Sequence, residues 1–251
     1  AYERYLKDMV WYKKIVMWPF AQLDLLKMKY WERKMWRKAD RLATVSEADR
    51  DIIAHDTGRK DVIVIPNGVD TEKFKARETK INNKTILFIG EFKWFPNIEA
   101  VEWLVKEIFP AIKKEVADAK LLIAGRHMPA WLKSLKTEGI IVDDSIEDIR
   151  EAYEKATIFL APLKSGSGTK YKILEAMASG VPIVTTPVGA EGLDKSCMMV
   201  ADDVSTLANA TVRVFNNPKD YETLTKKARQ LVENNYDWSI IGEKLEKIIN
   251  P

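Results

Sequence analysis

The sequence predicts an α/β fold in which a doubly wound parallel sheet follows a helical segment. From residue 85 to residue 200, short apolar runs alternate with segments of helical periodicity, and this order is typical of parallel strands joined by crossover helices. The runs ILFI, LLIA and IFLAPL contain no alternation of apolar and polar residues. Such runs are typical of strands that are buried on both faces, as in a sheet covered by helices on each side.

The predicted elements follow in order along the chain. A short strand at 42–46 precedes a helix at 47–55 capped by Ser46, and a strand at 62–66 ends at the Asn67–Gly68 turn, before a polar stretch at 71–83. The later predicted strands are 85–90, 120–125, 139–142, 157–163, 182–186 and a short one near Met198, and the later predicted helices are 97–116, 129–136, 146–155, 170–179, 205–215, 219–234 and 238–249.

Residues 1–41 form a basic and aromatic segment of their own. They hold 11 Lys or Arg, 5 Asp or Glu, and 9 of the 24 aromatic residues. Apolar residues recur every three or four positions on both sides of Pro19, which predicts two helices divided by that proline. Two interpretations stay open: a helix pair packed against its own protein, which is the commoner arrangement, and a peripheral contact with an anionic membrane surface.

The composition excludes several classes of protein. Hydrophobic residues make up 46% of the chain, and 40 Lys and Arg nearly balance 37 Asp and Glu, so the net charge is +3. The hydrophobic content is that of a globular protein. The small net charge argues against a chain-wide affinity for nucleic acid. Cys197 is the single cysteine, which excludes an internal disulfide and a thiolate zinc cluster and favours the reducing cytoplasm. No transmembrane segment is predicted.

Three loops follow the carboxyl ends of predicted strands, where parallel sheets bind their ligands. The first begins at Gly90 and the second contains Arg126. The third is a glycine-rich turn, KSGSGT, that leads directly into the helix predicted at 170–179. Small residues before a helix leave its first N–H groups uncovered, so this turn is a candidate anion site. Its candidate residues are Gly166, Ser167, Gly168 and Thr169.

Two lysines break a rule at the start of that helix. Lys170 and Lys172 both lie in its first turn, where each positive charge costs about 0.3–1 kcal/mol against the helix dipole. A bound diphosphate would make these positive charges favourable. Because unfavourable local charges are typical of functional sites, the two lysines indicate a site for such a ligand. The alternative is that both lysines face the solvent and that Lys172 pairs with Glu175, three residues further on.

Glu175 is a single carboxylate on an otherwise apolar helix. It lies two turns after Gly168, on the same helix face, and it can accept hydrogen bonds from the hydroxyl groups of whatever the turn holds. An anion site at one end and a hydroxyl acceptor at the other fit the phosphates and the ribose of a nucleotide.

Several motifs together resemble those of a known protein family. The string GSGTKYKILEAMASGVPIVTTPVGAEGL, with LLIAGR, IGEFKWFPN, ADRLATVSEADRDII and VIPNGVDTEKF before it, is similar to the group 1 retaining glycosyltransferases. The resemblance covers residues 39–250. It implies the GT-B fold, in which two Rossmann-like domains face each other across a cleft.

The resemblance also implies a division of the chain. Residues 1–66 would be a helical segment and remnant of the acceptor-binding N-terminal domain, 67–236 the sugar-nucleotide-binding domain, and 237–251 a crossover helix. Most of the N-terminal domain would then be missing here, and we expect the chain alone to be inactive as a transferase because the acceptor must be held beside the donor.

Site residues carry over position by position. Glu175 matches the second glutamate of the family's glutamate pair, which holds the ribose hydroxyls, and Ser167 stands where the first glutamate usually contacts the donor sugar. Family members often carry an Arg and a Lys after the glycine of the first loop, where this sequence has Glu91 and Pro96. The positive charge for the diphosphate would then come from Lys170, Lys172 and from Arg126 or Lys93.

The implied function is transfer of a sugar, with retention, from a nucleoside diphosphate sugar to an acceptor sugar or lipid-linked glycan in cell-surface polysaccharide or glycolipid synthesis. The resemblance implies no metal and no cofactor besides the donor, in a cytoplasmic protein that is peripheral at the inner face of the membrane if residues 1–41 touch lipid. Two alternatives stay open: a nucleotide-sugar-binding module without catalysis, and another enzyme of this fold, such as a sugar-nucleotide epimerase or a phosphorylase.

Overall fold

The computed structural model describes residues 11–77, 83–166 and 168–249 and divides the chain into two compact units, residues 1–66 and 67–251. The first unit contains α2 (Trp11–Lys38), β1 (Leu42–Thr44), α3 (Glu47–Thr57) and β2 (Val62–Val64). The strands of the second unit are β3 (Thr85–Glu91), β4 (Lys120–Arg126), β5 (Ile140–Asp143), β6 (Ile158–Ala161), β7 (Ile183–Thr185) and β8 (Met199–Val200). Its helices are α4 (Phe95–Trp103), α5 (Phe109–Glu115), α6 (Ala130–Lys133), α7 (Arg150–Lys155), α8 (Tyr171–Ala178), α9 (Val204–Asn216), α10 (Pro218–Asn235) and α11 (Trp238–Ile249), with a π-helical turn at Leu104–Ile108 and a 3₁₀ turn at Lys195–Cys197.

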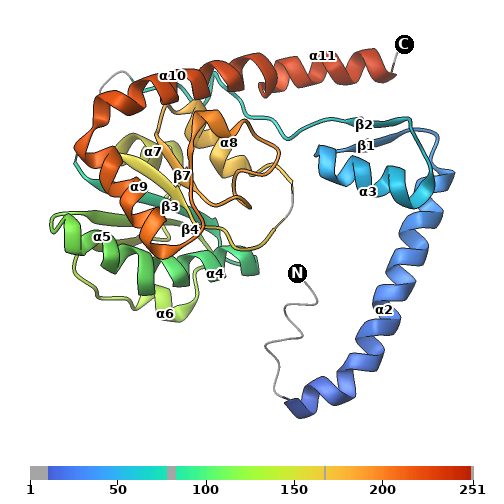
Figure 1. Cartoon of the computed structure of the whole chain (residues 1–251), viewed down its shortest axis with the longest axis horizontal. Helices are drawn as coiled ribbons and strands as arrows, with labels where there is room; N and C mark the ends of the chain where they lie inside the picture. Colours follow the sequence, from blue (N-terminus) through green and yellow to red (C-terminus); the bar gives the residue numbers. More distant parts are fainter. Residues whose placement is uncertain (1–10, 78–82, 167, 250–251) are drawn as a thin grey trace. The chain divides into compact units, whose positions relative to one another are not determined.

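In the first unit, β1 and β2 form a two-stranded parallel sheet joined by α3. As predicted, Ser46 caps α3, and its hydroxyl accepts the backbone N–H of Asp49 at 3.1 Å. The predicted break at Pro19 is wrong, because α2 continues through it as one helix. Figure 1 shows α2 bending near its first turns, which is how a helix accommodates an interior proline that lacks its N–H and crowds the preceding turn.

The aromatic segment stays largely open to solvent along α2. Trp31 is 55% exposed and Phe20 68% exposed, whereas Trp36 is partly buried. The side chains of Trp11 and Trp18 and the residues before Trp11 lie outside the described part of the chain. None of the described helices is both long and apolar enough to cross a membrane.

In the second unit, six parallel strands have the order β5-β4-β3-β6-β7-β8, which is that of the Rossmann fold. This confirms the parallel, doubly wound sheet that the alternation of strands and helices predicts. Side chains of each central strand alternate between two apolar cores: Ile86 and Phe88 of β3 point into one, and Leu87 and Ile89 into the other. Helices α4, α5 and α9 cover the first core, and α7, α8 and α10 the second (Figure 1). The sheet is therefore buried on both faces.

Three predicted helices differ in their bounds. The helix predicted at 97–116 is present at residues 95–115, but a π-helical turn interrupts it before Pro110, whose missing N–H breaks the regular ladder. The helix predicted at 146–155 begins only at Arg150, just after a local contact in which the carboxylate of Asp148 accepts the Arg150 N–H at 3.0 Å. The helix predicted at 129–136 shortens to Ala130–Lys133.

A pair of glycines closes β3 against β4 at their carboxyl ends. Gly90 and Gly125 are partners in the register, and Gly125 has φ +147°. A Cβ at Gly125 would lie 1.9 Å from the carbonyl oxygen of Gly90, which no side chain can tolerate. This edge of the sheet therefore depends on glycine for both its backbone conformation and its close packing.

We expect Gly125→Ala to lower the free energy of unfolding by more than about 3 kcal/mol, because the new methyl group meets backbone atoms that cannot move aside. Gly242→Ala is the matched control: a Cβ there meets nothing within 4 Å, and alanine in a helix should stabilise by up to about 1 kcal/mol. Urea denaturation of the two variants measures the difference. Equal stabilities would contradict the close packing of β3 on β4.

Candidate functional site

The site lies where the strand order of the sheet reverses. Chain order runs outward in opposite directions from β3 and β6, which are neighbours, and ligands of such sheets bind beyond the carboxyl ends of these strands. The three loops singled out from the sequence follow β3, β4 and β6, so all of them start at this edge.

A cavity of about 320 Å³ opens beyond β3 and β4. Three predicted site residues line it together, namely Gly90, Arg126 and Glu175. The glycines keep its floor free of side chains, and Arg126 is exposed at its rim. The other lining residues are Lys73, Phe74, Ile89, Glu91, Gly125, Ile146, Glu147, Asp148 and Ile149.

The glycine-rich turn leads into α8 and does not line this cavity. Gly166 has φ +119° and Gly168 has φ +71°, both in the region that favours glycine. Thr169 is buried, and its carbonyl oxygen accepts the side-chain amide of Asn67 at 2.8 Å. The turn is thus held by a contact across the unit. Ser167, also predicted for the site, lies outside the described residues.

Lys170 precedes α8 and folds back over the turn. Its Nζ donates to the carbonyl oxygen of Gly168 and lies 3.5 Å from Glu191 Oε2. The side chain is only 13% exposed, so it is held inside the turn and does not extend into solvent. The Lys170 ammonium, which the sequence predicts to contact an anion, therefore already contacts oxygen atoms of Gly168 and Glu191.

Lys172 points from the first turn of α8 to the end of β3. Its Nζ donates to the carbonyl oxygen of Ile89 and to Asn97 Oδ1, both at 2.6 Å, and lies 5.0 Å from the ring centre of Phe88. Burial lowers the pKa of Lys172 to about 7, against an opposing contribution from Glu175. An ammonium has three N–H donors, and contacts within the described residues use two of them.

Glu175 is oriented by a buried tyrosine. The hydroxyl of Tyr153, on α7, lies 3.0 Å from Glu175 Oε2 and 2.9 Å from the carbonyl oxygen of Lys172, and its single O–H is shared between these two acceptors. Burial raises the pKa of Glu175, although the bond from Tyr153 acts in the opposite direction. Glu175 is therefore a fixed, partly buried carboxylate in the cavity wall.

The two charged groups do not pair with each other. Among the described residues no ion pair joins Lys172 to Glu175, and burial shifts the pKa of each toward its neutral form. The alternative in which both lysines face the solvent and Lys172 pairs with Glu175 is therefore wrong. Side chains of this kind are costly to keep, and their cost is typical of a functional site.

The sequence missed three residues that position this site: Asn67, Asn97 and Tyr153. The sequence predicts Asn97 only as the start of a helix. In the structure its Oδ1 accepts from Lys172 Nζ, and its Nδ2 donates to the Glu91 carbonyl oxygen at 2.8 Å, so it joins Lys172 to the end of β3. Its place in the singled-out loop was the available signal. Tyr153 carried no signal, because its partners lie 19 and 22 residues away in the sequence.

Of the positive charges predicted for the loops after β3 and β4, Arg126 lines the cavity and Lys93, which is exposed, does not. Glu91, which stands where the family often has arginine, lies 2.8 Å from Nδ1 of His127. No cluster of three or more potential metal-binding side chains is found within residues 11–77, 83–166 and 168–249.

We expect Tyr153→Phe to lower the free energy of unfolding by about 1–3 kcal/mol, because it removes the hydroxyl that donates to the partly buried carboxylate of Glu175. Tyr171→Phe is the control, since that side chain is 51% exposed and its loss should change stability by less than about 0.5 kcal/mol. Urea denaturation at neutral pH compares them, and a Tyr153→Phe protein as stable as the parent would remove Tyr153 from the site.

The chain is similar in sequence to several curated proteins. The chain is 24% identical over 227 residues to a 44.6 kDa protein in the cps region of Klebsiella pneumoniae, covering 85% of this chain and 57% of that one. It is 25% identical over 206 residues to a phosphatidyl-myo-inositol mannosyltransferase of Mycobacterium leprae, covering 75% and 53%. The chain thus spans little more than half the length of these relatives.

Solved structures agree on the fold. Sucrose-phosphate synthase from Thermosynechococcus elongatus superposes with a TM-score of 0.73 at 18% identity, over 88% of this chain and 60% of that one. Anabaena HepE in complex with UDP superposes with a TM-score of 0.66 at 14% identity, over 84% and 64%. These neighbours are GT-B glycosyltransferases, so the predicted fold class is confirmed.

Family matches cover both units. Residues 15–73 match the family described as Glycosyltransferase Family 4. Residues 83–234, more than half of the chain, match the family described as Glycosyl transferases group 1. This range contains Gly90, Arg126, Lys172 and Glu175 of the candidate site. The chain therefore belongs to the group 1 glycosyl transferases.

Proposed function

We propose that residues 67–236 bind a nucleoside diphosphate sugar and that the whole protein transfers its sugar, with retention, to an acceptor. The observation that carries the proposal is the presence of two partly buried charged groups, Lys172 and Glu175, that form no ion pair with each other beside a cavity at the strand-order reversal. A nucleotide with its diphosphate would supply hydroxyl donors for the carboxylate and negative charge for the ammonium.

In this proposal Glu175 accepts the two ribose hydroxyls. The carboxylate is fixed by Tyr153 and forms part of the cavity wall, so it is ready to accept hydrogen bonds without first being ordered. Arg126 at the rim and the side-chain-free floor at Gly90 and Gly125 leave room for the base and the ribose. A nucleotide ligand is supported by Anabaena HepE, a neighbour of the same fold whose solved structure is a complex with UDP.

The diphosphate would lie against the start of α8. The N–H groups of the first helical turn, the amides of the turn at 166–169 and the ammonium groups of Lys170 and Lys172 would converge on it. Lys172 takes the place of the charges that the loop after β3 lacks, because Glu91 and Pro96 stand where family members often have Arg and Lys.

Transfer would then break the bond between the anomeric carbon and the diphosphate oxygen and form a bond from that carbon to an acceptor oxygen on the same face. The diphosphate leaves with the bonding electron pair, and the acceptor hydroxyl gives its proton to the departing diphosphate oxygen. Cations and amides that already point at the leaving oxygens stabilise the charge that develops there. A nucleophile on the enzyme is not needed.

For the acceptor we propose a polysaccharide or a lipid-linked glycan. Two relatives support this class: a phosphatidyl-myo-inositol mannosyltransferase and a protein in a cps region. The exposed basic and aromatic side chains of α2 would suit an acceptor located at a membrane surface. Release of nucleoside diphosphate by the whole protein only when a lipid-linked acceptor is present would distinguish transfer from binding alone.

Nucleotide titrations test the binding half of the proposal. We expect Glu175→Gln to weaken both nucleoside and nucleoside diphosphate by about 1–3 kcal/mol, because each carries the ribose. Lys172→Met should weaken only the diphosphate, because only that ligand carries the charge. Calorimetry with uridine, guanosine and adenosine and their diphosphates measures both effects.

Two variants serve as matched controls for these titrations. Lys120→Met removes an exposed lysine at the opposite, amino end of β4, and Glu115→Gln changes an exposed carboxylate at the end of α5. Both should bind every ligand as the parent does. If Lys172→Met and Lys120→Met had the same affinity for the diphosphate, Lys172 would have no part in binding.

A further inference from the structure

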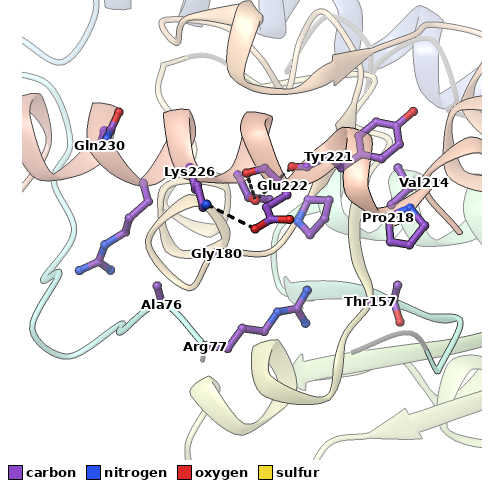
Figure 2. A pocket seen from close by; sticks show the side chains of 13 residues that line it. Ala76, Arg77, Thr157, Gly180, Val214, Pro218, Tyr221, Glu222, Lys226 and Gln230 are labelled. Atoms are coloured by element: carbon purple, nitrogen blue, oxygen red, sulfur yellow. Dashed lines mark hydrogen bonds and ion pairs between the residues drawn. The ribbon is translucent and has the colours of Figure 1, made fainter. Parts of the chain in front are cut away.

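A second and larger cavity, of about 460 Å³, lies at the other edge of the sheet. Thr157 and Pro182, which line it, stand just before β6 and β7, so this cavity is at the amino ends of the strands whose carboxyl ends face the candidate donor site. The first half of α10 forms one wall, and Ala76 and Arg77 form another (Figure 2). Its volume is within the range of small-molecule sites.

Arg77 is the unusual residue of this cavity. Its side chain is partly buried and reaches in among the lining residues, on the side opposite Tyr221, Glu222 and Lys226 of α10 (Figure 2). It donates from Nη1 to the carbonyl oxygen of Ala156, and among the described residues it has no carboxylate partner. Burial lowers the pKa of the guanidinium, which nevertheless stays protonated at neutral pH.

The other charges of the cavity are balanced. Lys226 Nζ lies 3.3 Å from Glu222 Oε1, and Arg229 Nε lies 2.6 Å from Glu233 Oε1. The positive charge of Arg77 is thus left uncompensated by the described residues. Because buried charges in proteins are normally paired, the guanidinium of Arg77 is suited to pair with one negative charge on a ligand.

Apolar side chains form much of the remaining wall, beside the polar Thr157, Thr225 and Gln230. Val214 at the end of α9 and Pro218 at the start of α10 face the cavity with Pro182 and Ala76. A ligand that fills this space needs an apolar body, and a single negative charge balances Arg77, whereas a dianion would bring in an unpaired negative charge. Guanidinium groups bind carboxylates through two parallel hydrogen bonds, and Arg77 has donors left for both.

We propose that this cavity is a second binding site, separate from the donor site, for a small amphipathic carboxylate. The carboxylate would be held by Arg77, and the apolar body would pack between Pro182, Val214 and Pro218. This inference does not depend on the proposed transfer reaction.

Calorimetric titration of the full 251-residue chain with decanoate tests the proposal, with decanol and inorganic phosphate as comparison ligands. We expect decanoate to bind with one-to-one stoichiometry, decanol to bind at least tenfold more weakly because it lacks the charge, and phosphate to show no saturable binding. Arg77→Gln should weaken decanoate at least tenfold, whereas Arg213→Gln, a change at an exposed arginine of α9, should not alter it.

A second variant leaves the charge in place. Ala76 is exposed at the mouth of the cavity, so Ala76→Trp should block entry without disturbing the core and weaken decanoate at least tenfold, while Lys75→Trp, at the exposed neighbouring residue, should not. The proposal is overturned if decanoate fails to bind, if decanoate and decanol bind equally well, or if either cavity variant keeps the parent's affinity.

Discussion

The burial of the Lys172 ammonium is the interaction on which the rest of the site depends. A lysine in the first turn of a helix already opposes the helix dipole, and here it is also withdrawn from solvent, so that its pKa falls to about 7. The fold tolerates this because Ile89 and Asn97 present oxygen atoms to the ammonium. These contacts join the start of α8, which follows β6 in the chain, to the end of the neighbouring strand β3.

Glu175 adds an opposite charge one helical turn away without cancelling the first. Tyr153 fixes the carboxylate and also accommodates the Lys172 carbonyl, so the two ionisable groups are held at a separation instead of forming a pair. A pair would be more stable and less useful, because a ligand would have to break it. Gly90 and Gly125 complete the arrangement by keeping side chains out of the adjacent cavity. Several unfavourable features are therefore gathered beside one cavity, as is typical of functional sites.

Much of this could be predicted from the sequence because it rests on local patterns. Buried parallel strands appear in the sequence as continuous apolar runs. The unfavourable position of a lysine in the first turn of a helix can also be recognised from a few neighbouring residues. Asn97 and Tyr153 could not be predicted in the same way, because their roles depend on contacts across the fold. The break expected at Pro19 failed for a different reason: the residues on both sides favour helix strongly enough for the chain to bend and continue.

The most direct test of the account is the pKa of the Lys172 side chain, followed by NMR of its ε-methylene group with and without a nucleoside diphosphate. The account predicts a midpoint of about 7 in the free chain, because burial disfavours the charged form. A bound diphosphate should favour that form and raise the midpoint by at least 1 unit, so that binding at pH 8 takes up a proton. A midpoint near the ordinary lysine value of 10.5 in the free chain, or one that the diphosphate leaves unchanged, would contradict it.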